Sequence, residues 1–171
     1  MLNVYKFYDN PKDLPLYDKL NGTIDLLMES TWWNPSMVGQ LEPLMSIIIK
    51  SPEFAFTYVA FVMEYSRWPE GEPAIMKEAR FAYAYARDVI KGRWHKAESI
   101  IMKNPMYAWL YARYVIKGRW EEAEPVIMTR AESAYQYAKN ILKSRWPEAE
   151  PYIQKKLNDW ATYKEYFGIK D

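Results

Sequence analysis

Small and apolar residues recur along most of this chain with the period of an α-helix, and the whole pattern then repeats. In residues 78–103 these residues fall at positions i, i+3, i+4, i+7 and i+8, which places them on one helical face. The same set returns 26 residues later, and again 26 residues after that. The face consists of Ala82, Tyr85, Ala86, Val89 and Ile90, then Ala108, Tyr111, Ala112, Val115 and Ile116, then Ala134, Tyr137, Ala138, Ile141 and Leu142. The pattern predicts a long first helix, helix A, in each repeat.

A turn and a shorter helix B are expected after each helix A. Gly92 and Gly118 lie where helix A should stop, since glycine accepts the left-handed or turn conformation needed there. An Arg-Trp pair follows in every repeat, and Pro69 and Pro147 come next, where proline suits the first turn of a new helix. Acidic residues in that turn favour the positive end of the helix dipole. Small and apolar residues four apart then form the core face of helix B: Ala97 with Ile101, Ala123 with Ile127, and Ala149 with Ile153.

The fixed period predicts an all-α fold, a short α-solenoid of two-helix repeats in which neighbours bury each other's apolar faces. We expect one folded unit: a diverged N-terminal helical cap at residues 1–50, four repeats at 51–155 and a capping half-repeat at 156–171. The first repeat carries one extra residue between Ala55 and Trp68, which predicts a bulge or an extra turn. In the half-repeat, Ala161 is expected in the place of Ala134.

The Arg-Trp pairs are interpreted as structural. The tryptophans, Trp68, Trp94, Trp120 and Trp146, should fill the elbow between helices A and B. Replacement of Trp120 by alanine is therefore expected to cost about 3–5 kcal/mol. Each arginine is followed five residues later by a glutamate, which predicts a ladder of ion pairs between successive repeats.

The composition limits which kinds of catalytic and metal sites this chain can form. The chain has no cysteine and one histidine, His95, so disulfides, thiolate catalysis and multi-histidine metal sites are excluded. No phosphate-binding loop, nucleophile elbow or metalloprotease motif occurs, and we predict a non-catalytic protein without cofactor or metal. The net charge of +1 argues against nonspecific coating of nucleic acid. No signal region or membrane-length apolar run is found, which predicts a cytoplasmic protein that binds no membrane.

One column of residues beside the core face of helix A is the candidate binding site. It carries an aromatic residue and two cations at i, i+4 and i+8 in three repeats: Tyr83, Arg87 and Lys91; Trp109, Arg113 and Lys117; Tyr135, Lys139 and Lys143. Such a ladder suits an acidic protein surface, since these residue types are common at interface hot spots. It also suits RNA or single-stranded DNA, or a nucleotide ligand bound between repeats. A solvated helix face is the remaining interpretation.

The segments AYAYARDVIKGRWHKAE and AWLYARYVIKGRWEEAEPVIM resemble a short helical repeat of uncharacterised proteins from large tailed bacteriophages and some bacteria. The resemblance covers residues 51–155 and rests on the recurring VIKGRW.EAEP signature. It implies an all-helical array and a small accessory protein that acts on a host component. Because stacked repeats form extended binding surfaces, we expect a protein in the host cytoplasm that binds and inhibits a host defence protein or metabolic enzyme. The identity of the partner and the oligomeric state are left open.

Overall fold

A computed structural model describes residues 44–170, and all its regular secondary structure in that range is helical. The chain forms two compact units, Met1–Ile75 and Met76–Asp171, so the first repeat and the other three fall in different units. Most of the predicted N-terminal cap, residues 1–43, lies outside the described part. The described helices confirm the expected all-α repeat fold.

The N-terminal unit contains α3 (Met45–Ile48), α4 (Pro52–Phe61) and α5 (Glu72–Ile75). Ser51 caps α4, because its hydroxyl oxygen accepts the N–H of Phe54 at 3.4 Å. The extra residue of this repeat is taken up after α4 by two consecutive left-handed residues, Glu64 at φ 47° and Tyr65 at φ 59°. The predicted irregularity is therefore a turn with two left-handed residues.

The C-terminal unit contains three helix A–helix B repeats and one final helix. Helix A continues into five residues of π-helix each time: α6 (Ala79–Tyr85) with η4 (Ala86–Ile90), α8 (Pro105–Tyr111) with η5 (Ala112–Ile116), and α10 (Ala131–Tyr137) with η7 (Ala138–Leu142). Helix B is α7 (His95–Ile101), then η6 (Glu121–Ala123) with α9 (Glu124–Ile127), then α11 (Glu150–Ile153). The final helix is α12 (Leu157–Phe167).

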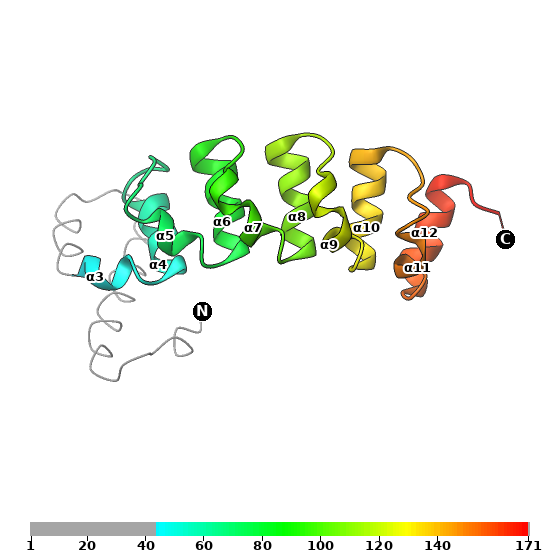
Figure 1. Ribbon diagram of the computed structural model, residues 1–171, viewed down its shortest axis with the longest axis horizontal. Coiled ribbons are helices and arrows are strands. Elements are labelled where there is room, and N and C mark those ends of the chain that lie inside the picture. The colour runs from blue at the N-terminus through cyan, green and yellow to red at the C-terminus, as the bar shows by residue number, and fades with distance from the viewer. Residues whose placement is uncertain (1–43, 171) are drawn as a thin grey trace. The chain divides into compact units, whose positions relative to one another are not determined.

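The helices of this unit are arranged in two rows. Within it, α6, α8, α10 and α12 stand side by side in chain order (Figure 1), and each contacts the next. Every helix B contacts the helix A of its own repeat and that of the following repeat. The short helices are therefore wedged between successive long ones, and packing between repeats stabilises helices too short to persist alone.

The predicted core faces are confirmed for their alanines and tyrosines, whereas most of the aliphatic residues at the end of helix A are only half-buried: Val89, Ile90, Ile116, Ile141 and Leu142. The alanines and tyrosines of the helix A face have no exposed surface: Ala82, Tyr85, Ala86, Ala108, Tyr111, Ala112, Ala134, Tyr137 and Ala138. The predicted helix B pairs are equally buried: Ala97, Ile101, Ala123, Ile127, Ala149 and Ile153. Alanine at these positions allows helices A and B to approach closely.

The tryptophans fill the elbows, as predicted. All four are buried, and the ring centroid of each lies 5.0–5.2 Å from that of the core tyrosine in its own repeat. The pairs are Tyr58 with Trp68, Tyr85 with Trp94, Tyr111 with Trp120, and Tyr137 with Trp146. Helix B begins directly after Trp94, at His95, which is exposed.

The residue that stops helix A is a lysine, and the expectation for the glycines is wrong. Lys91, Lys117 and Lys143 adopt the left-handed conformation, with φ of 56°, 60° and 53°, whereas Gly92 and Gly118 do not have positive φ. The N–H groups of Lys91 and Gly92 both donate to the carbonyl oxygen of Ala86. This closure ends the helix one residue earlier than the usual preference for glycine suggests.

The C-terminal half-repeat is present as α12, but its predicted register is wrong by one residue. Tyr163 is fully buried and takes the place of Tyr137, so Trp160 occupies the place of Ala134 and Ala161 is exposed. The Trp160 ring stacks on Tyr163, with 5.6 Å between centroids and 19° between planes.

Candidate functional site

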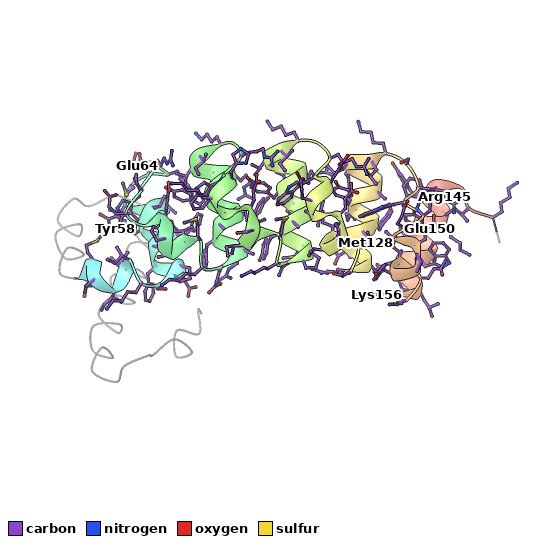
Figure 2. All side chains as sticks on the ribbon, viewed as in Figure 1. Tyr58, Glu64, Met128, Arg145, Glu150 and Lys156 are labelled. Carbon is purple, nitrogen blue, oxygen red and sulfur yellow. The ribbon has the colours of Figure 1, made fainter. Side chains whose placement is uncertain are left out.

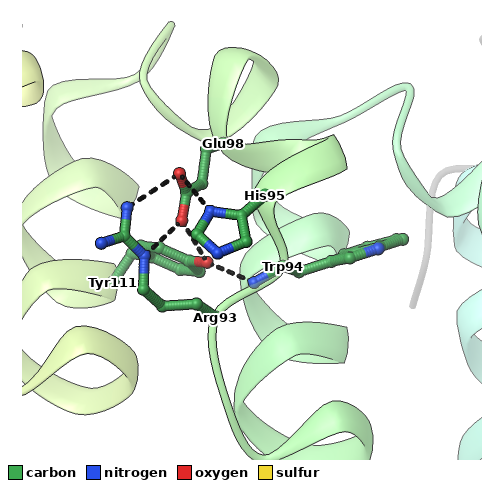
Figure 3. Close-up of polar contacts among 5 residues, drawn as sticks. All are labelled: Arg93, Trp94, His95, Glu98 and Tyr111. Carbon is green, nitrogen blue, oxygen red and sulfur yellow. Dashed lines mark hydrogen bonds and ion pairs between the residues drawn. The ribbon is translucent and has the colours of Figure 1, made fainter.

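A buried tyrosine from the third repeat reaches back into the elbow of the second. The hydroxyl of Tyr111 accepts the main-chain N–H of Trp94 at 2.6 Å and donates to Oε1 of Glu98 at 3.1 Å (Figure 3). Arg93 binds the same carboxylate with Nε and Nη2, at 2.8 and 3.0 Å, and Nδ1 of His95 lies 3.3 Å from Oε2. Three groups from two repeats, Arg93, His95 and Tyr111, thus meet at one glutamate.

The arrangement recurs at the next two junctions. The corresponding sets are Trp120, Tyr137, Glu124 and Arg119, then Trp146, Tyr163, Glu150 and Arg145. Figure 2 shows Arg145 and Glu150 at the last junction, where Nε lies 2.9 Å from Oε1. These arginine–glutamate pairs lie within one repeat, so the predicted ladder of ion pairs between repeats is wrong. The tyrosine hydroxyl makes the link between repeats.

The protonation states fit a structural role for this cluster. Burial raises the pKa of the Glu98 carboxyl, but hydrogen bonds from Arg93 and Tyr111 outweigh burial and leave the pKa below its ordinary value. Burial raises the pKa of Tyr111 to about 12. The carboxylate therefore stays ionised and the phenol neutral over the physiological range, with the carboxylate accepting hydrogen bonds and the phenol donating one. The arrangement is typical of a structural hydrogen-bond network that links buried groups, Trp94 and Tyr111, to an ion pair nearer the surface.

The predicted ladder brings a cation onto an aromatic ring in all three repeats. The Arg87 guanidinium carbon lies 5.1 Å from the Tyr83 ring centroid, and that of Arg113 lies 5.8 Å from the Trp109 ring. The ammonium nitrogen of Lys139 lies 5.6 Å from the Tyr135 ring. Contacts of this length are in the range of cation–π interactions. We call these six residues the helix A surface.

Two of the three rings are not presented to solvent. Tyr83 and Tyr135 are only 5% and 7% exposed, and Trp109 is half-buried. A residue of the next helix covers each tyrosine: Tyr107 lies 6.0 Å from Tyr83, and Tyr163 lies 6.1 Å from Tyr135, between ring centroids. Two of the three aromatic positions in the candidate binding column are therefore buried.

Two exposed tyrosines that the sequence pattern did not single out border the same cations. Tyr114 is 47% exposed with its ring centroid 5.3 Å from the Arg113 guanidinium, and Tyr166 is 51% exposed and 4.5 Å from the Lys139 ammonium. Tyr114 lies outside the i, i+4, i+8 spacing, and Tyr166 lies in the half-repeat without an Arg-Trp pair. Their aromatic character is the only feature of the sequence that could have indicated these two residues.

The cations of the surface differ in how far they are neutralised. Arg87 binds the Asp88 carboxylate at 2.6 and 2.7 Å, which raises the pKa of the guanidinium further. The place of Asp88 is taken by Tyr114 and Asn140 in the next two repeats. Within the described range, Arg113 and Lys139 form no ion pair with a carboxylate. Positive charge on the surface is therefore concentrated in the third and fourth repeats.

The remaining three residues of the predicted ladder form a row of their own. Lys91, Lys117 and Lys143 are exposed, and each occupies the same left-handed position at the end of helix A. Their φ and ψ angles agree within 7° and 4°, from 53° to 60° and from 31° to 35°. We call these residues the lysine row. Identical backbone geometry means that the side chains leave successive helices in equivalent directions.

A groove of about 410 Å³ lies between the third and fourth repeats. Arg119 and Arg145 line it together with Glu121, Glu124 and Glu148, and Arg119 is paired with Glu124. Charges of both signs are mutually compensated there, so the groove favours no ligand of one sign. In the part of the chain that is described, no three His, Asp or Glu side chains converge as metal ligands.

The fold defines this protein as an all-α tandem repeat. The chain matches no family model, no curated protein and no solved structure at a significant level, so the resemblance to the bacteriophage repeat stays a prediction. None of the helices between residues 44 and 170 has the length and apolar character needed to cross a membrane.

Proposed function

We propose that this protein is a non-catalytic binding module that engages an acidic surface of a partner protein through the helix A surface, with Tyr114 and Tyr166. The observation that carries the proposal is the recurrent seating of a cation on an aromatic ring in three successive repeats. A cation held over a ring loses little rotamer freedom on binding, so its contact with a carboxylate costs less entropy. Exposed tyrosines beside such cations match the composition of interface hot spots.

Nucleic acid is the second candidate, and ring accessibility disfavours it. Single-strand binders stack bases on exposed aromatic faces. Here Tyr83 and Tyr135 are buried, and Arg87 and Lys139 lie against their rings. The ladder therefore offers few free ring faces, although its cations suit phosphate and carboxylate alike. The phage origin, host-defence target and cytoplasmic location implied by the resemblance remain predictions alongside this proposal.

The test is affinity capture of the tagged protein from a nuclease-treated lysate of the cells that encode it. The doubly changed variant Arg113→Glu/Tyr114→Ala should lose the captured protein, because it reverses a half-buried cation and removes an exposed ring of the surface. The charge-matched control is Lys96→Glu, since Lys96 is exposed on α7 and does not belong to the helix A surface. Circular dichroism should show that all variants remain helical.

Retention of one stoichiometric protein by the wild type and by Lys96→Glu, with loss in the double variant, supports the proposal. Equal capture by all three proteins would place the binding surface elsewhere. Titration of fluorescent oligouridylate into the same proteins separates the second candidate. Tight binding that falls steeply with salt and disappears in the double variant would favour nucleic acid instead.

A further inference from the structure

Each residue of the lysine row has a left-handed backbone conformation, which is energetically unfavourable for a residue with a side chain. A left-handed residue with a side chain is less stable than glycine there by about 1–2 kcal/mol, because Cβ crowds the following carbonyl. Glycine is the usual residue at this point of a helix. In this chain a lysine takes the position three times, with glycine or serine immediately after it. A strained position that recurs with one side chain type is a reason to assign that side chain a function.

The spacing of the row sets the period of a matching ligand. Helices packed side by side, as α6, α8 and α10 are, lie about 8–10 Å apart. A polyproline II segment has three residues per turn and advances about 3.1 Å per residue, or roughly 9.3 Å per turn. Every third side chain of such a segment therefore lies on the same side and meets successive helices of the array.

We infer that the lysine row recognises an extended, proline-rich acidic segment of the partner, with a carboxylate at every third residue. This inference rests on the proposed function. Charge complementarity selects the acidic side chain, since Lys91, Lys117 and Lys143 are exposed cations that form no carboxylate pair within the described range. The exposed ring of Tyr114, three residues before Lys117 on the same helix, suits a proline of the segment, because aromatic surfaces bind polyproline II segments.

The experiment uses two labelled peptides of equal charge, (Glu-Pro-Pro)5 and (Glu-Pro-Pro-Pro)5, and fluorescence anisotropy with the full chain at low ionic strength. Both peptides favour polyproline II, but a spacing of four rotates successive carboxylates by about a third of a turn. We expect the three-residue period to bind at least about fivefold more tightly, because only it engages several lysines at once. Equal affinity for the two peptides would overturn the inference.

Three variants test whether the lysines cause the preference for the three-residue period. Lys117→Gln keeps the backbone strain and removes one charge, and it should weaken binding of (Glu-Pro-Pro)5 about two- to fivefold. The triple variant Lys91→Gln/Lys117→Gln/Lys143→Gln should bind both peptides alike. Lys96→Gln on α7 is the matched control and should leave the preference unchanged. A preference that survives in the triple variant would contradict the assignment to this row.

The outcomes of the capture and peptide experiments distinguish a failure of this inference from a failure of the proposed function. If capture of a protein depends on Arg113 and Tyr114 while the peptides show no period preference, the binding module stands and the extended acidic ligand is wrong. Tighter binding of oligouridylate than of either peptide, lost in the triple glutamine variant, would assign the row to phosphate and overturn the inference.

Discussion

The hydroxyl of Tyr137 accepts the main-chain N–H of Trp120 at 2.8 Å, although the two residues belong to different repeats. The same hydroxyl donates to Oε1 of Glu124 at 3.1 Å, and Arg119 holds that carboxylate from the other side. One phenol therefore satisfies a buried amide and a buried acid at once. Burial raises the pKa of Tyr137, which keeps the donor proton in place. The connection between repeats depends on a directional bond as well as on apolar contact.

Tyr137→Phe should destabilise the protein by about 1–3 kcal/mol, because it leaves the buried N–H of Trp120 without an acceptor. Ring packing against Trp146 is retained in the variant, so the loss isolates the hydroxyl. Urea unfolding followed by circular dichroism measures the change. Tyr107→Phe is the matched control, since the Tyr107 hydroxyl forms no hydrogen bond within the described range, and it should change stability by less than about 0.5 kcal/mol. Equal effects of the two changes would contradict the prediction.

Acid should weaken the last junction through Glu150. The hydrogen bond from Arg145 lowers the pKa of this carboxyl below its ordinary value of 4.5, against the opposing effect of burial. A carboxyl with a lowered folded pKa stabilises the protein above the unfolded value, and this contribution is lost as the pH falls through the folded value. Wild type should therefore exceed Glu150→Gln in stability at pH 7, and the gap should close toward pH 3. Urea midpoints at the two pH values measure it. For Glu148→Gln, which removes an exposed charge, the gap should be small at both.

Much of the fold could be predicted from the sequence because a single repeat period determines where the core residues lie. The alanines and tyrosines at helical spacing and the recurring tryptophan lie where the pattern places them, at Tyr111 and Trp120 for example. The predicted register is wrong in α12, because it aligned Ala161 with Ala134, whereas the buried Tyr163 takes the place of Tyr137. The helix stop was misplaced at Gly92, because glycine preference was the only signal and the hydrogen bonds to Ala86 decided the outcome.

The candidate site was harder to predict because neighbouring repeats decide exposure. Spacing correctly paired Arg113 with Trp109. It could not show that Tyr107 and Tyr163 cover Tyr83 and Tyr135, since those contacts cross between helices. Partners that are 13 and 17 residues apart, as at each tyrosine hydroxyl, likewise have no signature in a helical period.

Lys117→Gly should stabilise the fold while Lys117→Gln should not. Glycine removes the strain of a left-handed residue at φ 60°, and this relief exceeds the entropy that glycine adds to the unfolded chain. Both variants lose the same ammonium group near the negative end of helix A. We therefore expect the glycine variant to be more stable than the glutamine variant by about 0.5–1 kcal/mol in urea unfolding. A glycine variant no more stable than the glutamine one would show that the left-handed lysine is not strained.

Gly71→Ala should destabilise the N-terminal unit, although the corresponding position is alanine in the other three repeats. A methyl group added at Gly71 would overlap the six-membered ring of the Trp68 indole, which lies against this buried glycine. The ring also contacts Tyr58, at 5.0 Å between centroids, so it can move only by breaking that contact. Overpacking of this kind costs about 1–3 kcal/mol. Gly118→Ala is the control, because a methyl group there meets no atom within 4 Å and should change stability by less than about 0.5 kcal/mol. Urea unfolding of both variants measures the difference, and a Gly71→Ala protein as stable as wild type would show that the Trp68 ring moves aside at no cost.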